Sequence, residues 1–241
     1  MICKDIIGLT PVENILYDEV LLTLAEQGQM GEVLRFWESP ETFIVLGKIS
    51  KAEEDVFFSA TRTDRIPVLR RFSGGGTVLQ GKGCLNYTLI LAKELHPTIH
   101  DLHGSYRFIF SKILQALQVL GIQAEYQLTS DLVLKDSRRK FSGNAQHRRK
   151  KFILHHGTIL CDFDLPLMEK YLRMPKAIPV YRGDRSHKDF IVNLHLSPAR
   201  IKQELMNVFH AHPVIKILSQ KESELLQTFV STKSVELAFG V

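Results

Sequence analysis

The chain has 241 residues, of which 44% are hydrophobic and 24% charged, and its 31 lysines and arginines outnumber its 26 acidic residues. This composition excludes a wholly disordered chain, a collagen and a disulfide scaffold, and no apolar run reaches the roughly 20 residues that a membrane helix needs. Three cysteines without a Cys-X-X-Cys pair are typical of a reducing compartment and argue against a structural zinc site. The N-terminus lacks a basic and then apolar signal pattern, so we expect a cytoplasmic protein.

The first half of the chain is expected to contain one helix and several short strands. Apolar residues keep helical spacing from Val12 to Leu24, behind a proline at position 11 that suits a first helical turn. The turn Gly81-Lys82-Gly83 joins the last two strands. Strands are expected over residues 32–37, 42–47, 66–71, 77–80 and 84–91.

A second helix and a region rich in strands follow. The apolar stripe from Leu102 to Leu120 predicts a helix, and residues 131–162 return to short strands with polar turns. Ser197-Pro198 opens another helix, and Ser219 begins a capping box for the last one. Strand clusters broken by isolated helices predict an α+β fold with a mixed or antiparallel sheet, in a single domain over residues 1–241.

The positive charge is concentrated in one segment that contains no acid. Its seven cationic residues exceed the net charge of +5, so the rest of the chain is slightly acidic. We expect this segment to face an anion, which could be a nucleotide phosphate, a nucleic acid or an acidic protein. Its lysines and arginines are Arg138, Arg139, Lys140, Arg148, Arg149, Lys150 and Lys151.

The sharpest local signal is the sequence RRFSGGGT at residues 70–77, at the end of a predicted strand. Three consecutive glycines do not stabilise a strand, because each costs backbone entropy and buries no side chain. They let the backbone approach a ligand and point successive N–H groups at an anion, while Arg70 and Arg71 offer bidentate contacts to phosphate or carboxylate. These residues alone predict an anion-binding loop, with a flexible hairpin turn as the alternative.

Two further segments contain residues suited to chemistry. KFSGNA, at residues 140–145, is expected to form a polar loop. Its small residues would let Lys140 lie against a phosphate or a developing oxyanion, whereas a solvated basic loop without a ligand is the alternative. Asp131 is either a turn residue or a carboxylate beside this lysine. His155 and His156 are adjacent on a predicted strand and face opposite sides, so at most one points into a site, and we expect no metal pair there.

In this order, RRFSGGGTV, SDLVL, KFSGNA and HHGTIL resemble the motifs of the lipoate-protein ligase A family, in the biotinyl/lipoyl protein ligase superfamily. The resemblance covers about residues 30–165 directly and implies a catalytic domain distantly like that of class II synthetases. It implies an enzyme that uses ATP and Mg²⁺ to convert lipoate to lipoyl-adenylate and then acylates one lysine of a carrier. The implied partners are apo lipoyl-carrier domains of 2-oxoacid dehydrogenase complexes or the H protein. Neither a membrane nor a nucleic acid is expected as a partner.

The resemblance also assigns roles to residues. Lys140 would be catalytic, bridging the adenylate phosphate and the acyl carbonyl, and the basic residues 148–151 would dock an acidic carrier. Trp37 and Val78 would contribute to an apolar slot for the acyl tail, and no metal ligands are implied. The implied nucleotide and acyl-adenylate site comprises Arg70, Arg71, Gly75, Gly76, Thr77, Val78, Leu79, Asp131, Lys140, Gly143, Ala145 and His156.

Two features depart from the family pattern. The chain has Val78-Leu79-Gln80-Gly81 where many family ligases have a Val-Phe-His-Asp type sequence. No C-terminal accessory domain is evident, so adenylate formation could need a separate subunit, or the protein could transfer only a preformed adenylate.

Two other functions stay open on the sequence. An octanoyl- or lipoyl-amidotransferase of the same superfamily would work through an acyl-cysteine thioester. Residues 125–130, where such a cysteine would be expected, contain none, and Cys84 and Cys161 lie in apolar strand patterns typical of core residues. A nucleic-acid-binding module would use the basic segment, but Phe141 and Phe152 are the aromatic residues interleaved with it.

Overall fold

The computed structural model describes residues 1–127, 130–176 and 178–233, and these residues form the predicted α+β fold. In that part of the chain, the larger of two sheets has eight strands in the order β11-β1-β2-β6-β10-β9-β8-β7. β1 pairs in parallel with both neighbours, and the other pairs are antiparallel, so the sheet is mixed as predicted. The strands are β1 (Ile2–Asp5), β2 (Val33–Trp37), β6 (Cys84–Ala92), β7 (Ala124–Gln127), β8 (Asp131–Leu134), β9 (Lys140–Arg148), β10 (Phe152–Leu160) and β11 (Val214–Ile215).

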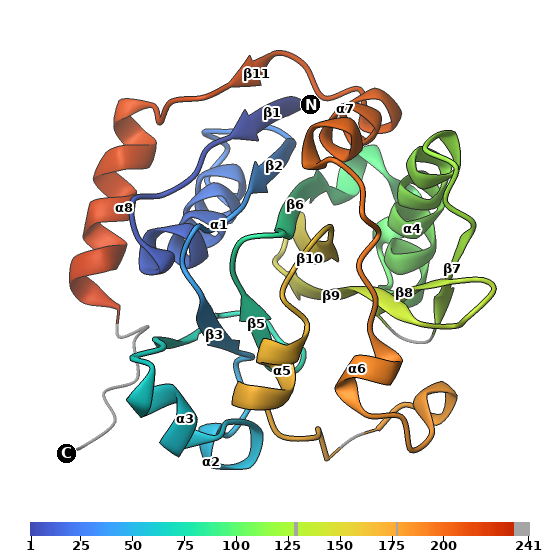
Figure 1. Cartoon of the computed structure of the whole chain (residues 1–241). Helices are drawn as coiled ribbons and strands as arrows, with labels where there is room; N and C mark the ends of the chain where they lie inside the picture. The colour runs from blue at the N-terminus through green and yellow to red at the C-terminus, as the bar shows by residue number, and fades with distance from the viewer. Residues whose placement is uncertain (128–129, 177, 234–241) are drawn as a thin grey trace.

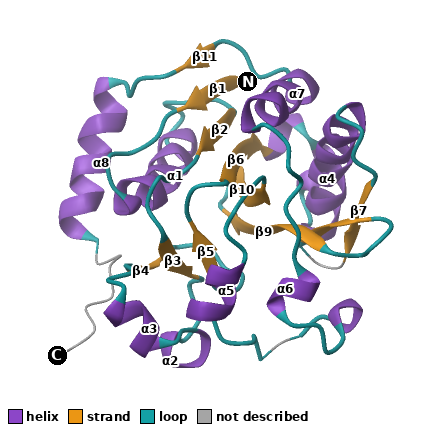
Figure 2. Cartoon of the chain, in the orientation of Figure 1, coloured by secondary structure: helices purple, strands orange, loops and turns teal. Residues whose placement is uncertain are grey.

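A smaller sheet, whose strands are labelled β3, β4 and β5 in Figure 2, lies at one end of the molecule. Its central strand β3 (Phe43–Leu46) pairs in parallel with β4 (Val68–Arg70) and antiparallel with β5 (Val78–Gln80). β5 and β6 therefore belong to different sheets. The turn Gly81-Lys82-Gly83, expected to join two neighbouring strands, leads the chain from the small sheet to the large one.

Helices cover both faces of the large sheet (Figure 1). α4 (Leu102–Val119) and α7 (Pro198–Phe209) share one core with alternate residues of β6. α1 (Pro11–Glu26) packs on the opposite face, and α8 (Gln220–Thr232) lies against its outer side. The shorter helices are α2 (Ala52–Asp55), α3 (Phe58–Thr63), α5 (Pro166–Tyr171) and α6 (His187–Phe190), with 3-10 turns η1 (Lys93–Leu95), η2 (Pro97–Ile99) and η3 (Val180–Arg182).

Local sequence explains where the long helices begin. Thr10 accepts a hydrogen bond from the Glu13 backbone, and Glu13 returns one to Thr10, which forms a capping box in front of α1. Ser219 and Glu222 form the predicted capping box of α8. No helix in the described residues is long and apolar enough to cross a membrane.

Strand β6 shows how the fold prepares a site. Leu85, Tyr87 and Leu89 point into the core under α4, as the period of two in a strand requires. Asn86 and Thr88 point to the opposite face, where they line a cavity instead of joining the apolar core under α1. A polar patch is therefore built into the middle of an otherwise apolar sheet.

Candidate active site

Lys140 opens strand β9, so the segment that the sequence predicted as a polar loop is part of the sheet. β8 pairs Leu132 with Ser142 and the next residue, Val133, with Lys140, which leaves Phe141 as an extra residue on β9. A bulge of this kind changes which face the side chains beyond it occupy. Here it brings Lys140 to the sheet face that α1 covers, where its side chain lines a cavity.

Two cavities meet at Lys140. The inner one, about 140 Å³, lies between the large sheet and α1, and its apolar wall includes Trp37, Val45 and Val78. The outer one, about 510 Å³, is bounded on its far side by residues between Leu172 and Ile191. Eight residues line both cavities: Gly76, Thr77, Val78, Ser130, Asp131, Lys140, Gly143 and Thr158.

The ammonium of Lys140 is held at this junction by a carboxylate. Its Nζ lies 2.8 Å from Asp131 Oδ1, and its side chain remains 28% exposed, so a ligand can reach it. Ser130 Oγ donates to the same carboxylate oxygen at 3.3 Å, and Tyr181 Oη donates to Oδ2 at 2.5 Å. The structure thus places the predicted aspartate beside the predicted lysine.

The outer cavity has an excess of basic side chains. Three acids line it, namely Glu54, Asp55 and Asp131, and the Asp55 carboxylate accepts a hydrogen bond from Thr77. Such a surplus favours a polyanionic ligand. The basic lining residues are Lys51, Lys140, Arg173, Lys176 and Arg182.

The triglycine turn is packed closely against the backbone at the end of β3. Gly75 has φ +85°, in the region that favours glycine, and a Cβ on Gly47 would lie 1.9 Å from the Gly75 carbonyl oxygen. Arg71 Nη2 donates to the carbonyls of Gly74 and Gly76 at 2.7 and 2.8 Å. Burial lowers the pKa of Arg71 to about 10, so it stays cationic at neutral pH while it shapes the turn.

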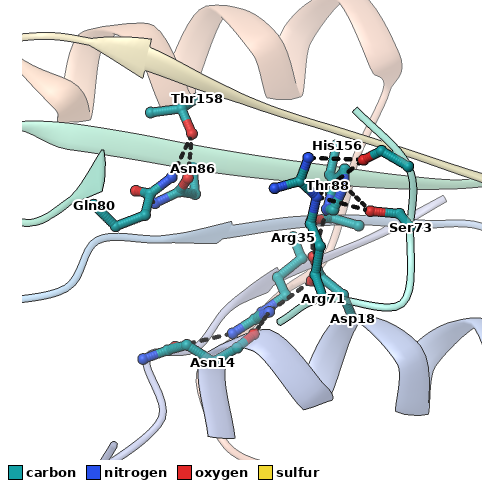
Figure 3. Close-up of polar contacts among 11 residues, drawn as sticks. Asn14, Asp18, Arg35, Arg71, Ser73, Gln80, Asn86, Thr88, His156 and Thr158 are labelled. Carbon is teal, nitrogen blue, oxygen red and sulfur yellow. Dashed lines mark hydrogen bonds and ion pairs between the residues drawn. The ribbon is translucent and has the colours of Figure 1, made fainter. Parts of the chain in front are cut away.

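A buried polar chain supports this turn from below (Figure 3). Arg71 Nε donates to Ser73 Oγ at 3.1 Å, Ser73 Oγ lies 2.8 Å from His156 Nε2, and His156 Nδ1 lies 3.2 Å from Asp18 Oδ2. Asp18 pairs in turn with Arg35 at 2.6 Å. The order of acid, imidazole and hydroxyl is that of a serine triad, but Ser73 is fully buried and lines neither cavity, so it serves the turn and not a substrate.

The two adjacent histidines face opposite sides, as predicted. His156 lines the inner cavity, whereas His155 is fully buried on the other face against the rings of Tyr87, Tyr106 and Phe110. Burial lowers the pKa of His155 to about 3, so this histidine is neutral in the fold. His156 alone of the pair is placed for chemistry.

Sequence reasoning missed the polar trio formed by Gln80, Asn86 and Thr158. Gln80 Nε2 donates to Thr158 Oγ1 at 2.8 Å, Thr158 Oγ1 to Asn86 Oδ1 at 2.6 Å, and Asn86 Nδ2 to Gln80 Oε1 at 2.9 Å, as Figure 3 shows. All three line the inner cavity. The available signal was the presence of an asparagine and threonines in otherwise apolar strands.

Most of the predicted site residues come together at these cavities. Arg70 and Gly75 are exceptions among the described residues, since neither lines a cavity. Arg70 Nη1 instead donates to the carbonyls of Gly47 and Ser50, which fixes the loop beside the triglycine turn. The predicted residues that line a cavity are Arg71, Gly76, Thr77, Val78, Leu79, Asp131, Lys140, Gly143, Ala145 and His156.

The cysteines lie outside this arrangement. Cys84 and Cys161 are buried, and neither is among the described residues that line the two cavities. Burial raises the pKa of Cys161 to about 12 and that of Cys84 further still, which opposes thiolate formation. In the same described part of the chain, no three histidine, cysteine or carboxylate side chains gather to hold a metal ion.

Comparison with known proteins gives a consistent family. The model described as the lipoyl protein ligase A/B catalytic domain matches residues 10–210. The probable lipoate-protein ligase A of Mycoplasma pneumoniae is 28% identical, over 91% of this chain and 67% of that protein. The putative lipoate-protein ligase A of Aeropyrum pernix is 31% identical, over 85% and 72%, and the octanoyltransferase LipM of Macrococcus caseolyticus is 30% identical, over 64% and 63%.

The chain is shorter than several of these relatives. It spans 59% of the probable lipoate-protein ligase A of Mycoplasma genitalium and 47% of the putative one of Schizosaccharomyces pombe. Among solved structures, a bi-partite lipoate protein ligase from Thermoplasma acidophilum superposes with a TM-score of 0.79 at 21% identity, over 97% of this chain and 93% of that one. A lipoate-protein ligase A bound with ATP gives 0.79 at 20% identity, over 97% and 94%. At these identities the likeness establishes a shared fold.

Proposed function

The chain belongs to the family of lipoyl protein ligase A/B catalytic domains, and from this premise we propose that it activates lipoate with ATP and transfers the lipoyl group to a carrier lysine. One observation supports this most strongly. Lys140 stands where a small, partly apolar cavity meets a larger, basic one. A mixed anhydride of a fatty acid and a nucleotide has this composition: an apolar tail, a charged junction and a polar nucleotide.

We assign the two halves of the adenylate accordingly. The acyl tail occupies the inner cavity against Trp37 and Val78, and the nucleotide occupies the outer cavity. The backbone of residues 76–79 approaches the nucleotide closely, because the glycine lacks a side chain. Lys140 lies between the halves, within reach of the phosphate and the acyl carbonyl.

The proposed reaction has two steps. A carboxylate oxygen of lipoate attacks the α-phosphorus of ATP, and pyrophosphate leaves as the acyl–phosphate bond forms. The amine of the carrier lysine then attacks the acyl carbon, AMP leaves, and the amine loses a proton as the amide forms. Lys140 stabilises the negative charge that develops in both steps, and no side-chain nucleophile is required.

The carboxylates of the outer cavity fit a nucleotide that arrives with Mg²⁺. This ion is usually held by one or two carboxylates together with substrate phosphates. Asp55 lines the cavity and supplies an oxygen ligand of this kind. Once bound, the ion would neutralise phosphate charge, while the positioning of the acyl group stays with Lys140 and the triglycine turn.

We propose a lipoyl-carrier domain as the acceptor, from a 2-oxoacid dehydrogenase complex or as the H protein. The bi-partite ligase from Thermoplasma acidophilum was studied with its E2 lipoyl domain. A basic turn at residues 148–151 suits an acidic carrier surface.

The decisive experiment separates the two steps. In one arm, the purified chain receives lipoate, ATP and Mg²⁺, and pyrophosphate release is measured. In the other arm, it receives chemically prepared lipoyl-adenylate and an apo lipoyl domain, and the mass of the domain is measured. Transfer without pyrophosphate release assigns this chain to the second step, with activation by a separate subunit, and no reaction in either arm refutes the proposal.

Lys140→Ala tests the assignment of the lysine. Removing a charge that stabilises the transition state should reduce both steps by about 10² to 10³ fold or more. Lys135→Ala is the matched control, because Lys135 is exposed on the β8–β9 turn and lines neither cavity. Transfer by Lys140→Ala at the wild-type rate would contradict the role of this residue.

Octanoyl transfer through an acyl-cysteine is the second candidate, because an octanoyltransferase is among the relatives. Cys84 and Cys161 are buried away from the cavities, which opposes this route. The double variant Cys84→Ala, Cys161→Ala should therefore retain full transfer. Loss of transfer with normal folding would favour the thioester route.

A further inference from the structure

We propose that Tyr181 is a positioning residue that couples the segment over the outer cavity to Lys140 by fixing the carboxylate of Asp131. This inference rests on the proposed function for the role of Lys140. Tyr181 itself lines neither cavity among the described residues, whereas Asp131 lines both. The Tyr181 hydroxyl donates to Asp131, so its influence on Lys140 passes through this carboxylate.

The two oxygens of Asp131 have different partners. Oδ1 lies 2.8 Å from Lys140 Nζ, and Oδ2 accepts the Tyr181 hydroxyl at 2.5 Å. An ammonium has three N–H donors, and the contact to Oδ1 uses one of them. With Oδ2 occupied by Tyr181, Asp131 holds Lys140 from one side and leaves the other donors for a ligand.

Tyr181 is suited to a constant contact. Burial, together with the negative charge of Asp131, raises its pKa far above the usual value, so the hydroxyl keeps its proton at any physiological pH. The hydroxyl therefore always donates, and the carboxylate always accepts. The pair acts as a fixed strut and does not exchange a proton.

The strut is anchored in the segment formed by residues 178–191. The Tyr181 ring packs on Phe190, with centroids 5.4 Å apart, and Arg185 Nη2 donates to the Tyr181 carbonyl at 2.6 Å. Arg139 Nη2 donates to the Ile191 carbonyl at 2.6 Å, next to Lys140 on β9. Tyr181 thus moves with this segment and not independently.

The same segment forms a wall of the outer cavity through Pro179, Arg182, Phe190 and Ile191. A nucleotide that binds there contacts the wall and shifts or fixes the segment. Because Tyr181 is part of the segment, the nucleotide also fixes Asp131 and hence Lys140. Binding of a ligand in the outer cavity is therefore coupled to the position of the Lys140 ammonium, where the two cavities meet.

Tyr181→Phe tests the strut, because it removes the hydroxyl and keeps the ring on Phe190. We expect kcat for lipoylation to fall about tenfold, the scale of a lost hydrogen bond to a charged group, with KM for lipoate and ATP within twofold of wild type. Tyr171→Phe is the matched control. Tyr171 Oη also donates to a carboxylate, that of Asp64, at 2.8 Å and away from Lys140, so its kcat should stay within twofold of wild type.

A double-mutant cycle distinguishes positioning from general damage. If Tyr181 acts through Asp131, then Tyr181→Phe should reduce kcat by less than twofold in the Asp131→Asn background. A second tenfold loss in that background would overturn the inference, as would an unchanged kcat in the single variant.

A second measurement does not depend on the ligase reaction. Labelling of Lys140 by an amine reagent, followed by peptide mass spectrometry, reports how firmly Asp131 holds the ammonium. Without Tyr181 the carboxylate of Asp131 is no longer fixed and holds the ammonium less firmly, so labelling of Lys140 in Tyr181→Phe should quicken at least twofold, while Lys135 is unaffected. An unchanged or slower rate overturns the strut, whereas faster labelling in a protein without ligase activity would refute the proposed function alone.

Discussion

The buried ion pair between Arg35 and Asp18 supports the residues that position the triglycine turn. Arg35 is fully buried on β2, and its guanidinium lies 4.6 Å from the Tyr17 ring centroid as well as against Asp18. Burial opposes ionisation of Asp18, but Arg35 and a hydrogen bond from His156 together keep the pKa of this carboxyl below its usual value. The charge on Asp18 then orients His156 and, through Ser73, the triglycine turn.

Arg35→Met should therefore destabilise the protein severely. Removing one partner of a buried ion pair leaves an unpaired buried charge, which costs about 3–5 kcal/mol of unfolding free energy. Thermal and urea unfolding measure this loss. Adding Asp18→Asn should recover part of it, and a double variant no more stable than Arg35→Met would contradict the pairing argument.

His155 gives the stability of the fold a pH dependence. In the unfolded chain a histidine titrates near its usual pKa of about 6.5, whereas burial lowers the pKa in the fold to about 3. At a pH between these two pKa values, His155 is protonated in the unfolded state and neutral in the folded state. Stability from this group is therefore complete above pH 6.5 and declines as the pH falls towards 3.

His155→Gln should flatten this decline. Wild-type stability should fall below pH 6.5 by about 1.4 kcal/mol per pH unit more steeply than that of the variant. Urea unfolding at pH 7, 6 and 5 gives the slope of unfolding free energy against pH for each protein. A loss of packing caused by the substitution lowers the free energy equally at each pH, so it does not change the slope. His195→Gln, at a side chain that is 73% exposed, should keep the wild-type slope, and equal slopes for all three proteins would refute a neutral His155.

At the scale of elements, the contact between β3 and the triglycine turn sets the position of the turn. Gly47 follows β3 and lies against the Gly75 carbonyl, and Lys48 N donates to the Ser73 carbonyl at 2.8 Å. The turn is therefore docked on the small sheet before any ligand binds. Its backbone N–H groups are positioned by this contact.

Gly47→Ala should displace the turn, because its new Cβ would meet backbone atoms that cannot rotate away. We expect a loss of about 1–3 kcal/mol of unfolding free energy and weaker ATP binding, measured by urea unfolding and calorimetry. Gly74→Ala is the matched control, since a Cβ there would meet nothing within 4 Å. Equal stability of the two variants would show that the turn is not held by this contact.

The elements that local patterns specify were predicted well, whereas the pairing and register of the strands were not. The stripe from Leu102 and the Ser219 capping box correctly predicted α4 and α8. Lys140 was assigned to a loop because the bulge at Phe141 depends on the register with β8, which the local sequence does not reveal.

The site shows the same division. The four motifs contain all eight residues that line both cavities. Asp18 and Arg35, in contrast, come from α1 and β2, far along the chain from His156, so their pairing has no local signature. Tyr181 was also missed, because its role depends on how residues 178–191 fold back over Asp131.

At the scale of the whole molecule, the basic turn at residues 148–151 lies far from Lys140. Arg148 is at the opposite end of β9 from Lys140, about 26 Å away for eight residues of strand. Its guanidinium donates to the carbonyls of Ile99 and His100 at 2.7 and 2.8 Å, so it supports the start of α4. Arg149, Lys150 and Lys151 remain exposed for a partner.

Two side chains, His147 and Lys48, lie between this turn and the cavity rim. His147 lies on the cavity face of β9, and its pKa is lowered by burial and by the charges of Arg149 and Lys48. Lys48 is exposed beside the triglycine turn. We propose that a carrier domain with an acidic surface rests on Lys48 and the exposed cations of this turn while its acceptor lysine reaches the acyl group. Docking and chemistry would then use different ends of one strand.

Charge reversal at Arg149, Lys150 and Lys151 should accordingly raise the carrier KM at least tenfold at low salt and leave the lipoate KM unchanged. The difference should shrink at high salt, because exposed charges are screened over about 10 Å at 0.1 M. Reversal at Arg200, Lys216 and Lys221 changes the net charge equally at exposed sites on α7, the β11 edge and α8, and should have little effect. If both triple variants raised the carrier KM alike, the attraction would be due to total charge. If neither variant raised it, the carrier would dock elsewhere. The docking surface is supported if the carrier KM rises only in the variant at the β9–β10 turn.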